Sequence, residues 1–354
     1  MKRILLVSNH VFHYRQKVYN YFYDAFLNDG YEFHVLSDSF QDAGYEYRFI
    51  RHDGKLNMKN CRDIIIRVQP EIVIIFLHLK DMVQIPLIHW CKLKKIKVIF
   101  WNKGLSDIDP DSAIKKILYH HIHNQSDALI TYTPDMVVNF QEKNRSKLFV
   151  AYNTVDCSDI DKSKYDRADI KLKYGIKEKY VVLYISRIRP AKKPEALINA
   201  LAYMPDIAVI MMGAGMNDEL QRKIDEIPNI YYVGQKYGDE GNEIWAIGDV
   251  FSIPVNCGLG INEAIFWGMP IVTMQGFQPP EIYYLKEGKT GYIAANEAEY
   301  KMQLLSLLHN NDELERMKSE CIKEYHAETS IQNMYHGFID AIRYCESEEI
   351  RQKT

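Results

Sequence analysis

Short hydrophobic runs alternate with amphipathic segments through the first half of the chain. The runs are rich in Ile and Val and predict five strands, at 4–8, 33–37, 72–77, 98–101 and 128–131. Apolar residues at helical spacing predict helices at 15–28, 58–68, 82–94, 113–124 and 134–142. Near-continuous apolar strands are typical of a parallel sheet covered on both faces. We therefore expect this half to consist of right-handed βαβ units.

The same alternation restarts near residue 180. It predicts strands at 180–186, 208–212, 230–233, 250–253 and 270–274, and helices at 194–203, 218–227, 262–267 and 297–308. The segment at 313–344 is also helical in character. Two doubly wound α/β domains in series are the simplest fold for this repeated pattern.

A polar, weakly periodic segment at 153–179 predicts a linker between these domains. The expected N-terminal domain is then 1–152 and the C-terminal domain 180–330, with a final helix at 331–354 that packs back on the N-terminal domain. Open α/β sheets bind ligands at the carboxyl ends of their strands. Two such Rossmann-like domains are therefore expected to face a central cleft.

The composition is that of a globular protein, at 47% hydrophobic and 26% charged residues. No apolar run approaches the roughly 18 residues that a membrane-spanning helix needs. The start, MKRILLVSNH, has the pattern of a first strand and not of a signal peptide. The six cysteines form no Cys-x-x-Cys pair, which favours free thiols in a reducing compartment. A cytoplasmic location is the resulting expectation.

Charge is unevenly distributed along the chain. Residues 1–150 carry 21 Lys and Arg against 16 Asp and Glu, while the whole chain has 44 against 47. The densest basic stretch is Lys92, Lys94, Lys95 and Lys97, with Lys115 and Lys116 downstream. A solvated helix end is the plainer interpretation. The alternative is contact with anionic lipid headgroups or an anionic acceptor, at the inner face of the plasma membrane. Nothing in the pattern indicates nucleic-acid binding.

Candidate chemistry lies in three stretches of the second half. In SRIRPAKKPEALINAL, residues 186–201, a strand ends at Ser186 and a loop then carries Arg187 and Lys192. Two cations at the carboxyl end of a strand can hold a diphosphate and neutralise it as it leaves. A solvated basic loop is the alternative for this stretch taken alone. In MMGAGMNDEL, residues 211–220, Gly213 and Gly215 allow a tight turn close to a ligand.

The third stretch, at 249–274, is the most informative. A buried strand leads into a loop with Gly258 and Gly260, and the helix that follows carries Glu263 in its first turn. Backbone amides at a helix start can bind phosphate oxygens. The Glu263 carboxylate either accepts hydrogen bonds from a ribose diol or complements the helix dipole.

These stretches together resemble glycosyltransferase family four, the retaining enzymes of GT-B architecture. The resemblance covers about residues 150–295, while the N-terminal half is similar only in layout. It rests on YNTVD at 152–156, Ser186-Arg187 through Pro190 to Lys192, Gly213 to Gly215, NIYYVGQ at 229–235, Gly258-Leu259, Glu263, Gly268 to Val272 and PEIYYLKEGKTGYIA at 280–294.

The resemblance implies retaining transfer from a nucleoside diphosphate sugar. Arg187, Lys192 and Glu263 would be the catalytic residues. The donor would be bound by Ser186, Gly213, Gly215, Asn256, Cys257, Gly258, Leu259 and Gly260. A glycan or lipid-linked glycan would be the acceptor, as in surface polysaccharide synthesis.

Two departures from the family pattern stand out. The family has a second glutamate beside the donor sugar, and this sequence has Val255 in its place. Asn256 or the backbone around Cys257 and Gly258 would substitute for it. Where the family has a histidine after the fourth N-terminal strand, this sequence has Asn102 and Lys103. A sugar-nucleotide epimerase on the same fold and a catalytically silent binding protein therefore remain alternatives.

The loop after the first strand, SNHVFHYRQ, supplies further candidates on the acceptor side. His10, His13, Tyr14 and Arg15 would lie where the N-terminal domain meets its ligand, together with Asn102 and Lys103. Solvent-facing residues at a helix start are the alternative.

Asp107, Asp109 and Asp111 spell overlapping D-x-D motifs, which bind a divalent cation in other glycosyltransferases. They also precede a predicted helix, where aspartate is favoured as a cap. Because Arg187 and Lys192 can neutralise the diphosphate, we assign neither a metal nor a cofactor.

Overall fold

The computed structural model describes residues 1–41, 44, 46–105 and 113–353, with side chains described up to residue 348. Asp107, Asp109 and Asp111 lie outside the described residues. The chain forms two compact units. Unit 1 comprises residues 1–156 and 330–354, and unit 2 comprises residues 157–329.

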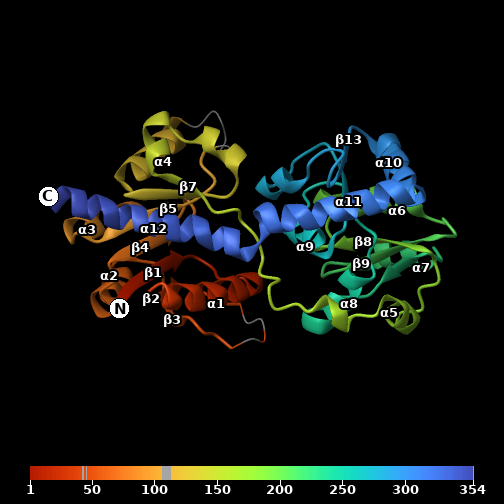
Figure 1. The fold of residues 1–354 in the computed structure, drawn as a ribbon, viewed down its shortest axis with the longest axis horizontal. Coiled ribbons are helices and arrows are strands. Elements are labelled where there is room, and N and C mark those ends of the chain that lie inside the picture. Colours follow the sequence, from red (N-terminus) through yellow and green to blue (C-terminus); the bar gives the residue numbers. More distant parts are fainter. Residues whose placement is uncertain (42–43, 45, 106–112, 354) are drawn as a thin grey trace. The chain divides into compact units, whose positions relative to one another are not determined.

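Unit 1 contains a seven-stranded parallel sheet in the order β3-β2-β1-β4-β5-β6-β7 (Figure 1). Its elements are β1 (Lys2–Ser8), α1 (His13–Asn28), β2 (Tyr31–Ser37), β3 (Ile50–Asp53), α2 (Met58–Val68), β4 (Ile72–Phe76), α3 (Gln84–Leu93), β5 (Lys97–Trp101), α4 (Ala113–Gln125), β6 (Ala128–Thr131), the 3₁₀ turns η1 (Pro134–Asn139) and η2 (Glu142–Lys147), β7 (Leu148–Val150) and α12 (Ile331–Lys353).

Both faces of this sheet are buried, because successive side chains of a strand point to opposite faces. In β1, Ile4 and Leu6 join a core beneath α1 and α12, whereas Leu5 and Val7 join a core beneath α2, α3 and α4. The parallel sheet covered on both faces, expected from the Ile- and Val-rich runs, is confirmed.

Unit 2 contains a six-stranded parallel sheet in the order β10-β9-β8-β11-β12-β13. Its elements are η3 (Lys162–Lys164), α5 (Arg167–Lys173), β8 (Tyr180–Ile185), η4 (Pro190–Lys192), α6 (Pro194–Leu201), β9 (Ile207–Met212), α7 (Asp218–Asp225), β10 (Ile230–Tyr232), α8 (Gly238–Ala246), β11 (Val250–Phe251), α9 (Gly260–Trp267), β12 (Ile271–Met274), η5 (Pro280–Tyr284), β13 (Gly291–Ala294), α10 (Glu297–His309), α11 (Asn311–Glu324) and the π-helical turn η6 (Tyr325–Thr329).

The structure corrects several predicted elements. Residues 134–142 form no α-helix but two 3₁₀ turns, the first starting at Pro134. The helix expected at 313–344 is interrupted by η6, so α11 and α12 are separate helices. The segment at 153–179 is not irregular throughout, because its residues 167–173 form α5 of unit 2.

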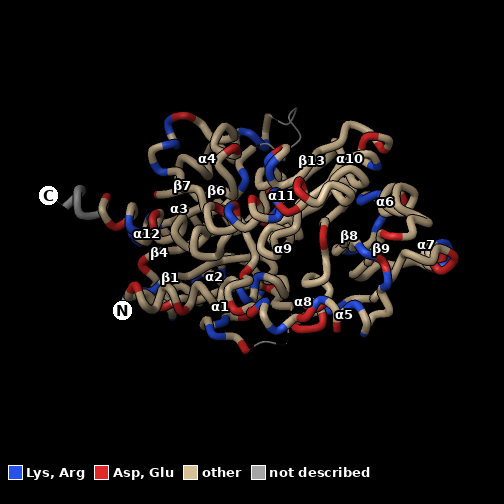
Figure 2. The backbone as a smooth tube through the Cα atoms, turned by 45° about the vertical axis from the view of Figure 1, so that its right-hand side comes forward, with Lys and Arg blue, Asp and Glu red and all other residues tan. Residues whose placement is uncertain are grey.

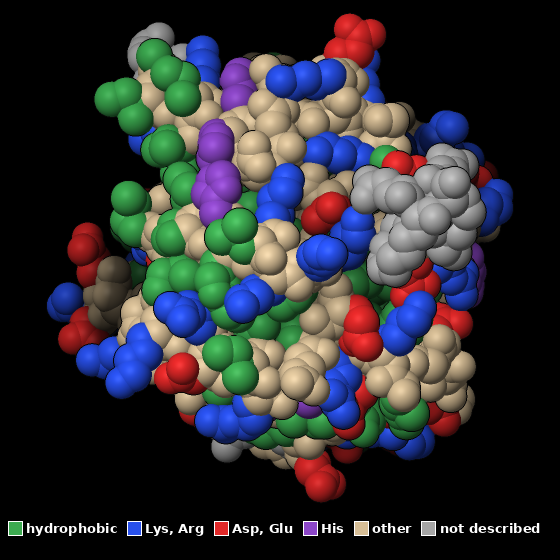
Figure 3. Space-filling view, turned by 90° about the vertical axis from the view of Figure 1, so that its left-hand side faces the viewer, with side chains coloured by type: hydrophobic (Ala, Val, Ile, Leu, Met, Phe, Trp, Pro, Cys, Tyr) green, Lys and Arg blue, Asp and Glu red, His purple; other side chains and the backbone are tan. Residues whose placement is uncertain are grey.

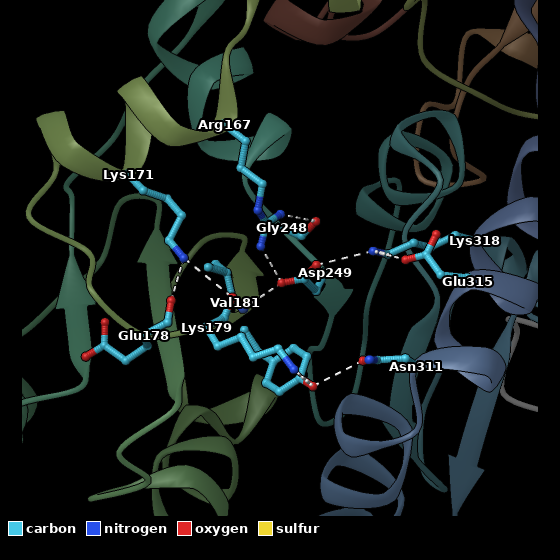
Figure 4. A network of polar contacts seen from close by, with 11 residues as sticks. Arg167, Lys171, Glu178, Lys179, Val181, Gly248, Asp249, Asn311, Glu315 and Lys318 are labelled. Carbon is cyan, nitrogen blue, oxygen red and sulfur yellow. Dashed lines mark hydrogen bonds and ion pairs between the residues drawn. The ribbon is translucent and has the colours of Figure 1, made fainter.

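At the amino-terminal edge of the unit 2 sheet, the carboxylate of Asp249 fixes three elements (Figure 4). Its Oδ2 pairs with Arg167 Nη2 of α5 at 2.5 Å and accepts a hydrogen bond from the Val181 amide of β8 at 2.9 Å. Its Oδ1 pairs with Lys318 Nζ of α11 at 3.3 Å. Asp249 is buried, so this network ties α5 and α11 to the strands at the edge away from the loops described next.

Candidate active site in unit 2

Strands β8 and β11 lie side by side in the middle of the unit 2 sheet. The chain winds from β8 to β9 and β10 on one side, and through β11 to β12 and β13 on the other. Their carboxyl ends therefore flank the topological switch point, where open α/β sheets bind ligands. Ser186 follows β8, and the loop at 252–259 follows β11. The sequence candidates of unit 2 are thus brought to one edge of the sheet.

Glycine is required where the loops after β8 and β9 cross. Gly213 has φ of 142°, and a Cβ there would lie 2.1 Å from the carbonyl oxygen of Ser186. Gly215 has φ of 98°, and a Cβ there would lie 2.4 Å from the carbonyl oxygen of Ile188. The Ile188 amide also donates to the Ala214 carbonyl at 2.7 Å. Any side chain at these two positions would push the loops apart.

Lys192 is buried at the end of η4, with 5% of its surface exposed. Its ammonium donates a hydrogen bond to the backbone carbonyl of Asn256, which lies in the β11–α9 loop. Burial lowers the pKa of Lys192 to about 8, and the positive charge of Arg189 acts in the same direction. Lys192 thus links the loop after β8 to the loop after β11. Its ammonium group is largely shielded from water.

Arg187, by contrast, is exposed. No ion pair or side-chain hydrogen bond holds its guanidinium within the part of the chain that the structure describes. A side chain in this position is available to a ligand. Arg189, on the same loop and also exposed, was missed by the sequence analysis, because lone arginines in a basic loop carry no distinguishing pattern.

The β11–α9 loop is held by a small network behind it. Asn256 adopts a left-handed conformation, with φ of 60°. The Cys257 amide donates to Gln278 Oε1 at 3.1 Å, and Gln278 Nε2 donates to Thr273 Oγ1 at 2.9 Å. The Cys257 thiol is buried and donates to the Ile253 carbonyl at 3.3 Å, and burial raises its pKa to about 11, which favours the neutral thiol. Gln278 is a supporting residue that no sequence motif indicated.

Helix α9 begins at Gly260, directly after Gly258 and Leu259, and carries Glu263 in its first turn. Glu263 is partly exposed, whereas Ile261, Asn262 and Ala264 around it are buried. Val255 stands where the second glutamate was expected, and its side chain is buried. It packs against Gly276 so closely that a Cβ added to this glycine would lie 3.1 Å from Val255 Cγ1. It is therefore a packing residue, and the site has only one carboxylate on this helix and loop.

The acceptor-side candidates lie at the corresponding edge of unit 1. The His10 imidazole pairs with the Ser39 hydroxyl, and His13 Nδ1 lies 3.3 Å from Gln41 Oε1. Tyr14 stacks on Phe12, with ring centroids 5.6 Å apart.

Arg15 is buried and does not point into solvent. Its Nη2 donates to Asn153 Oδ1 at 2.6 Å, and its guanidinium lies 5.0 Å from the Trp101 ring centroid. Its Nη1 has no hydrogen-bond partner among the described protein atoms.

The two residues at the position of the expected histidine differ in their surroundings. Asn102 is buried, and its Oδ1 accepts hydrogen bonds from the Gly104 amide at 2.7 Å and from His123 Nε2 at 3.2 Å. Burial lowers the pKa of His123 to about 3, so this imidazole is neutral. Asn102 thus shapes its own loop. Lys103 is partly exposed, with its ammonium 5.6 Å from the Tyr132 ring centroid.

The described residues contain no cluster of three or more His, Cys, Asp or Glu side chains arranged to hold a metal ion. Within those same residues, no helix has the length and hydropathy needed to cross a bilayer.

Known proteins resemble this chain in sequence and in fold. Residues 166–324 match the family "Glycosyl transferases group 1". Over 150 residues, the chain is 29% identical to the sulfoquinovosyl transferase SQD2 of Arabidopsis thaliana, a match that covers 40% of this chain and 29% of that protein. The matched stretches span about half or less of the length of the first curated relatives.

Solved structures match over nearly the whole chain. A glycosyltransferase from Rickettsia africae has a TM-score of 0.76 at 15% identity, covering 98% of each chain. Alr3699/HepE of Anabaena, solved in complex with UDP and glucose, has a TM-score of 0.72 at 12% identity, covering 97% of this chain and 100% of that one. The protein therefore has the GT-B fold, with two Rossmann-like α/β domains. Unit 2 carries a glycosyltransferase domain of the group 1 type.

Proposed function

We propose that this protein transfers a sugar from a nucleoside diphosphate sugar to a glycan or lipid-linked glycan, with retention of the anomeric configuration. The observation that carries the proposal is the convergence of Arg187, Lys192 and Glu263 at the switch point of the unit 2 sheet. The complex of the Anabaena protein with UDP and glucose supports a nucleotide-sugar donor on this fold.

The chemical demand in such a transfer is the charge of the departing diphosphate. Arg187 and Lys192 would stabilise it, and amides at the start of α9, around Gly258 and Gly260, would bind its oxygens. These cations would neutralise the leaving group, so we assign no metal. Glu263 would accept hydrogen bonds from the ribose diol, and a phosphate oxygen of the leaving group would take the acceptor's proton.

The acceptor would approach from the edge of unit 1 where His10, His13, Tyr14, Arg15 and Lys103 lie. A buried guanidinium with a free Nη1 suits an anionic acceptor, such as one that carries a phosphate. A lipid-linked acceptor implies work at an anionic membrane surface, as in surface polysaccharide synthesis.

The test is incubation with a panel of nucleoside diphosphate sugars, first ranked by the rise in melting temperature that each nucleotide causes. Release of nucleoside diphosphate, and an NMR measurement of the anomeric configuration of the product, would establish transfer with retention. The activity is expected to persist in excess chelator. Interconversion of the donor without acceptor would instead indicate an epimerase, and nucleotide binding without any turnover would indicate a silent binding protein. Either result would overturn the proposal.

A further inference from the structure

The helices that cover one face of the unit 1 sheet expose large aliphatic side chains on their outer side. Ile66 of α2, Leu93 of α3, and Ile114 and Ile117 of α4 have 59%, 82%, 73% and 65% of their surface exposed. The inner side of the same helices already supplies the core through residues such as Ile65, Leu87, Ile88 and Ile122. The four exposed aliphatic residues therefore add nothing to that core. We call them, with the basic residues around them, the outer helical surface.

Basic residues outnumber acidic ones on these three helices; Asp107, Asp109 and Asp111, which precede α4 in the sequence, lie outside the described residues. Within their bounds, α3 and α4 carry Lys92, Lys115 and Lys116 and no Asp or Glu, and Lys94 and Lys95 follow α3 directly. Helix α2 adds Lys59, Arg62 and Arg67 against Asp63 alone. On α11 of unit 2, in contrast, acidic and basic residues are interspersed and paired (Figure 2). Figure 3 shows hydrophobic side chains beside blue and purple ones on one side of unit 1.

Side-chain contacts join the three helices into one surface. His89 Nε2 of α3 lies 2.8 Å from His121 Nε2 of α4, and Lys92 Nζ donates to Gln125 Oε1 at 3.2 Å. Arg62 of α2 lies over the Trp90 ring of α3, 5.7 Å from its centroid. The two α3–α4 contacts connect residues 32 and 33 positions apart, so the two helices run side by side in the same direction.

We propose that the outer helical surface docks on a lipid bilayer that contains anionic headgroups. Leu93, Ile114 and Ile117 enter the boundary between headgroups and acyl chains, while the lysines beside them bind lipid phosphates. Aliphatic side chains with lysines beside them suit a bilayer surface, where anionic headgroups cover an apolar interior. This proposal extends the membrane contact proposed above to a particular surface, and it does not depend on which sugar is transferred.

Charge also decides against a second copy of this chain as the occupant. A symmetric dimer through this surface would bring the lysines of α3 and α4 of one protomer against those of the other. Like charges at an interface oppose association. An anionic bilayer instead offers phosphates to the same lysines.

The outer helical surface begins at the same edge of the sheet as the acceptor candidates. Helices α3 and α4 follow β4 and β5, so they begin at the carboxyl edge of the sheet. His10 and Lys103 lie at that edge too, directly after β1 and β5. Ile114 and Ile117, in the first turns of α4, lie toward this edge, whereas Leu93, the last residue of α3, lies toward the opposite edge. A bilayer held against Ile114 and Ile117 would therefore lie near the acceptor candidates of the same unit.

Flotation of the whole protein with vesicles tests the proposal. One set of vesicles is phosphatidylcholine, and the other contains about 30% phosphatidylglycerol, a content sufficient to give a negative surface potential. The variants are Leu93→Ser, Ile114→Ser with Ile117→Ser, and Lys115→Gln with Lys116→Gln. Matched controls in unit 2 are Leu172→Ser, which removes another 82% exposed leucine, and Lys164→Gln with Lys177→Gln, also at exposed positions.

We expect binding to the anionic vesicles only, and weaker binding at high salt. The affinity for anionic vesicles should fall about tenfold or more in each aliphatic variant, through lost burial of apolar surface. It should fall about 25-fold in the double lysine variant, at roughly fivefold per lysine. The unit 2 controls should bind as the unaltered protein does. Equal binding by the surface variants, or absence of binding by the unaltered protein, would overturn the proposal. So would a dimer in sedimentation that Ile114→Ser with Ile117→Ser dissociates. Donor hydrolysis without vesicles, measured alongside, reports on the proposed function separately.

Discussion

The ammonium of Lys192 donates a hydrogen bond to the backbone carbonyl of Asn256, although the two residues are 64 positions apart. This bond connects the loop after β8 with the loop after β11, across the switch point of the sheet. It also places a buried positive charge beside the loop that leads to α9. The Lys192 side chain is therefore one of the contacts that hold the loops of the proposed diphosphate site together.

Lys192→Met should lower turnover by about 10²–10³-fold, because the departing diphosphate loses a preorganised charge. Lys193→Met is the matched control, since Lys193 is the exposed neighbour on the same loop. Steady-state kinetics of both variants, with melting curves, would check this. Near-normal turnover in Lys192→Met would remove the residue from the site.

The activity of the unaltered protein should fall as the pH rises above about 8. Burial lowers the pKa of Lys192 to about 8, so the ammonium loses its proton, and the site its charge, on the alkaline side of that value. The quantity to measure is kcat/KM, which reports on the free enzyme. Lys192→Arg should retain its charge throughout and lack this decline, because arginine does not titrate in the range. The same alkaline decline in Lys192→Arg would assign it to another group.

Donor affinity should decrease in the order unaltered protein, Glu263→Gln, Glu263→Ala. Hydrogen bonds to a charged group contribute roughly 1.5–3 kcal/mol each, so the alanine variant should lose about tenfold or more. Calorimetric titration with the nucleoside diphosphate measures this directly. If Glu263 served only the helix dipole of α9, the melting temperature would fall while the nucleotide affinity stayed unchanged.

Gly213→Ala should destabilise unit 2 far more than Gly175→Ala. Both glycines have positive φ, 142° at Gly213 and 69° at Gly175, and holding an alanine in such sparsely populated regions costs about 1–3 kcal/mol. Only at Gly213 would the Cβ also meet a backbone atom, the Ser186 carbonyl oxygen at 2.1 Å; at Gly175 nothing lies within 4 Å. Denaturant unfolding of the two variants compares the effects. Equal losses would mean that the loops after β8 and β9 can move apart without strain.

Asp249→Asn should destabilise the protein by about 1–3 kcal/mol, because the buried carboxylate that pairs with Arg167 and Lys318 would lose its charge. Glu315→Gln removes the other, exposed carboxylate that pairs with Lys318 and should cost about 0.5 kcal/mol or less. Nucleotide affinity should be unchanged in both variants, because this network lies at the opposite edge of the sheet. A large loss of affinity in Asp249→Asn would show that the two edges are coupled.

The central strands and the edge strand β10 were predictable from the sequence, whereas the edge strands β3, β7 and β13 were not. Strands such as β1 and β8 are buried on both faces and read as continuous apolar runs. The missed strands β3 and β7 have no fully buried residue, so their hydrogen bonding depends on a neighbouring strand and not on a local pattern. Helix α8, also missed, begins with GDEGNE, which contains two glycines and no apolar residue.

The candidate site also has some features that the sequence predicts and others that it does not. The positions of Gly213, Gly258 and Glu263 follow from local strand–loop–helix patterns, and the structure has them at loop and helix starts as expected. The burial of Lys192 and Arg15 could not be predicted, because it is produced by residues far away in the sequence, Asn256 and Asn153. Gln278 was missed for the same reason, since it acts through the Cys257 amide.

Unit 1 is built from two separate parts of the chain, residues 1–156 and 330–354, and this affects the order in which its core can form. Helix α12 supplies Met334, Phe338 and Ile342 to the core beneath α1, and its Tyr335 hydroxyl donates to Asp29, 306 positions earlier. During synthesis, unit 2 is made before this helix, so the part of the unit 1 core that α12 supplies can form only after the whole of unit 2 has been translated. The domain whose synthesis begins first is thus the last to receive its full core.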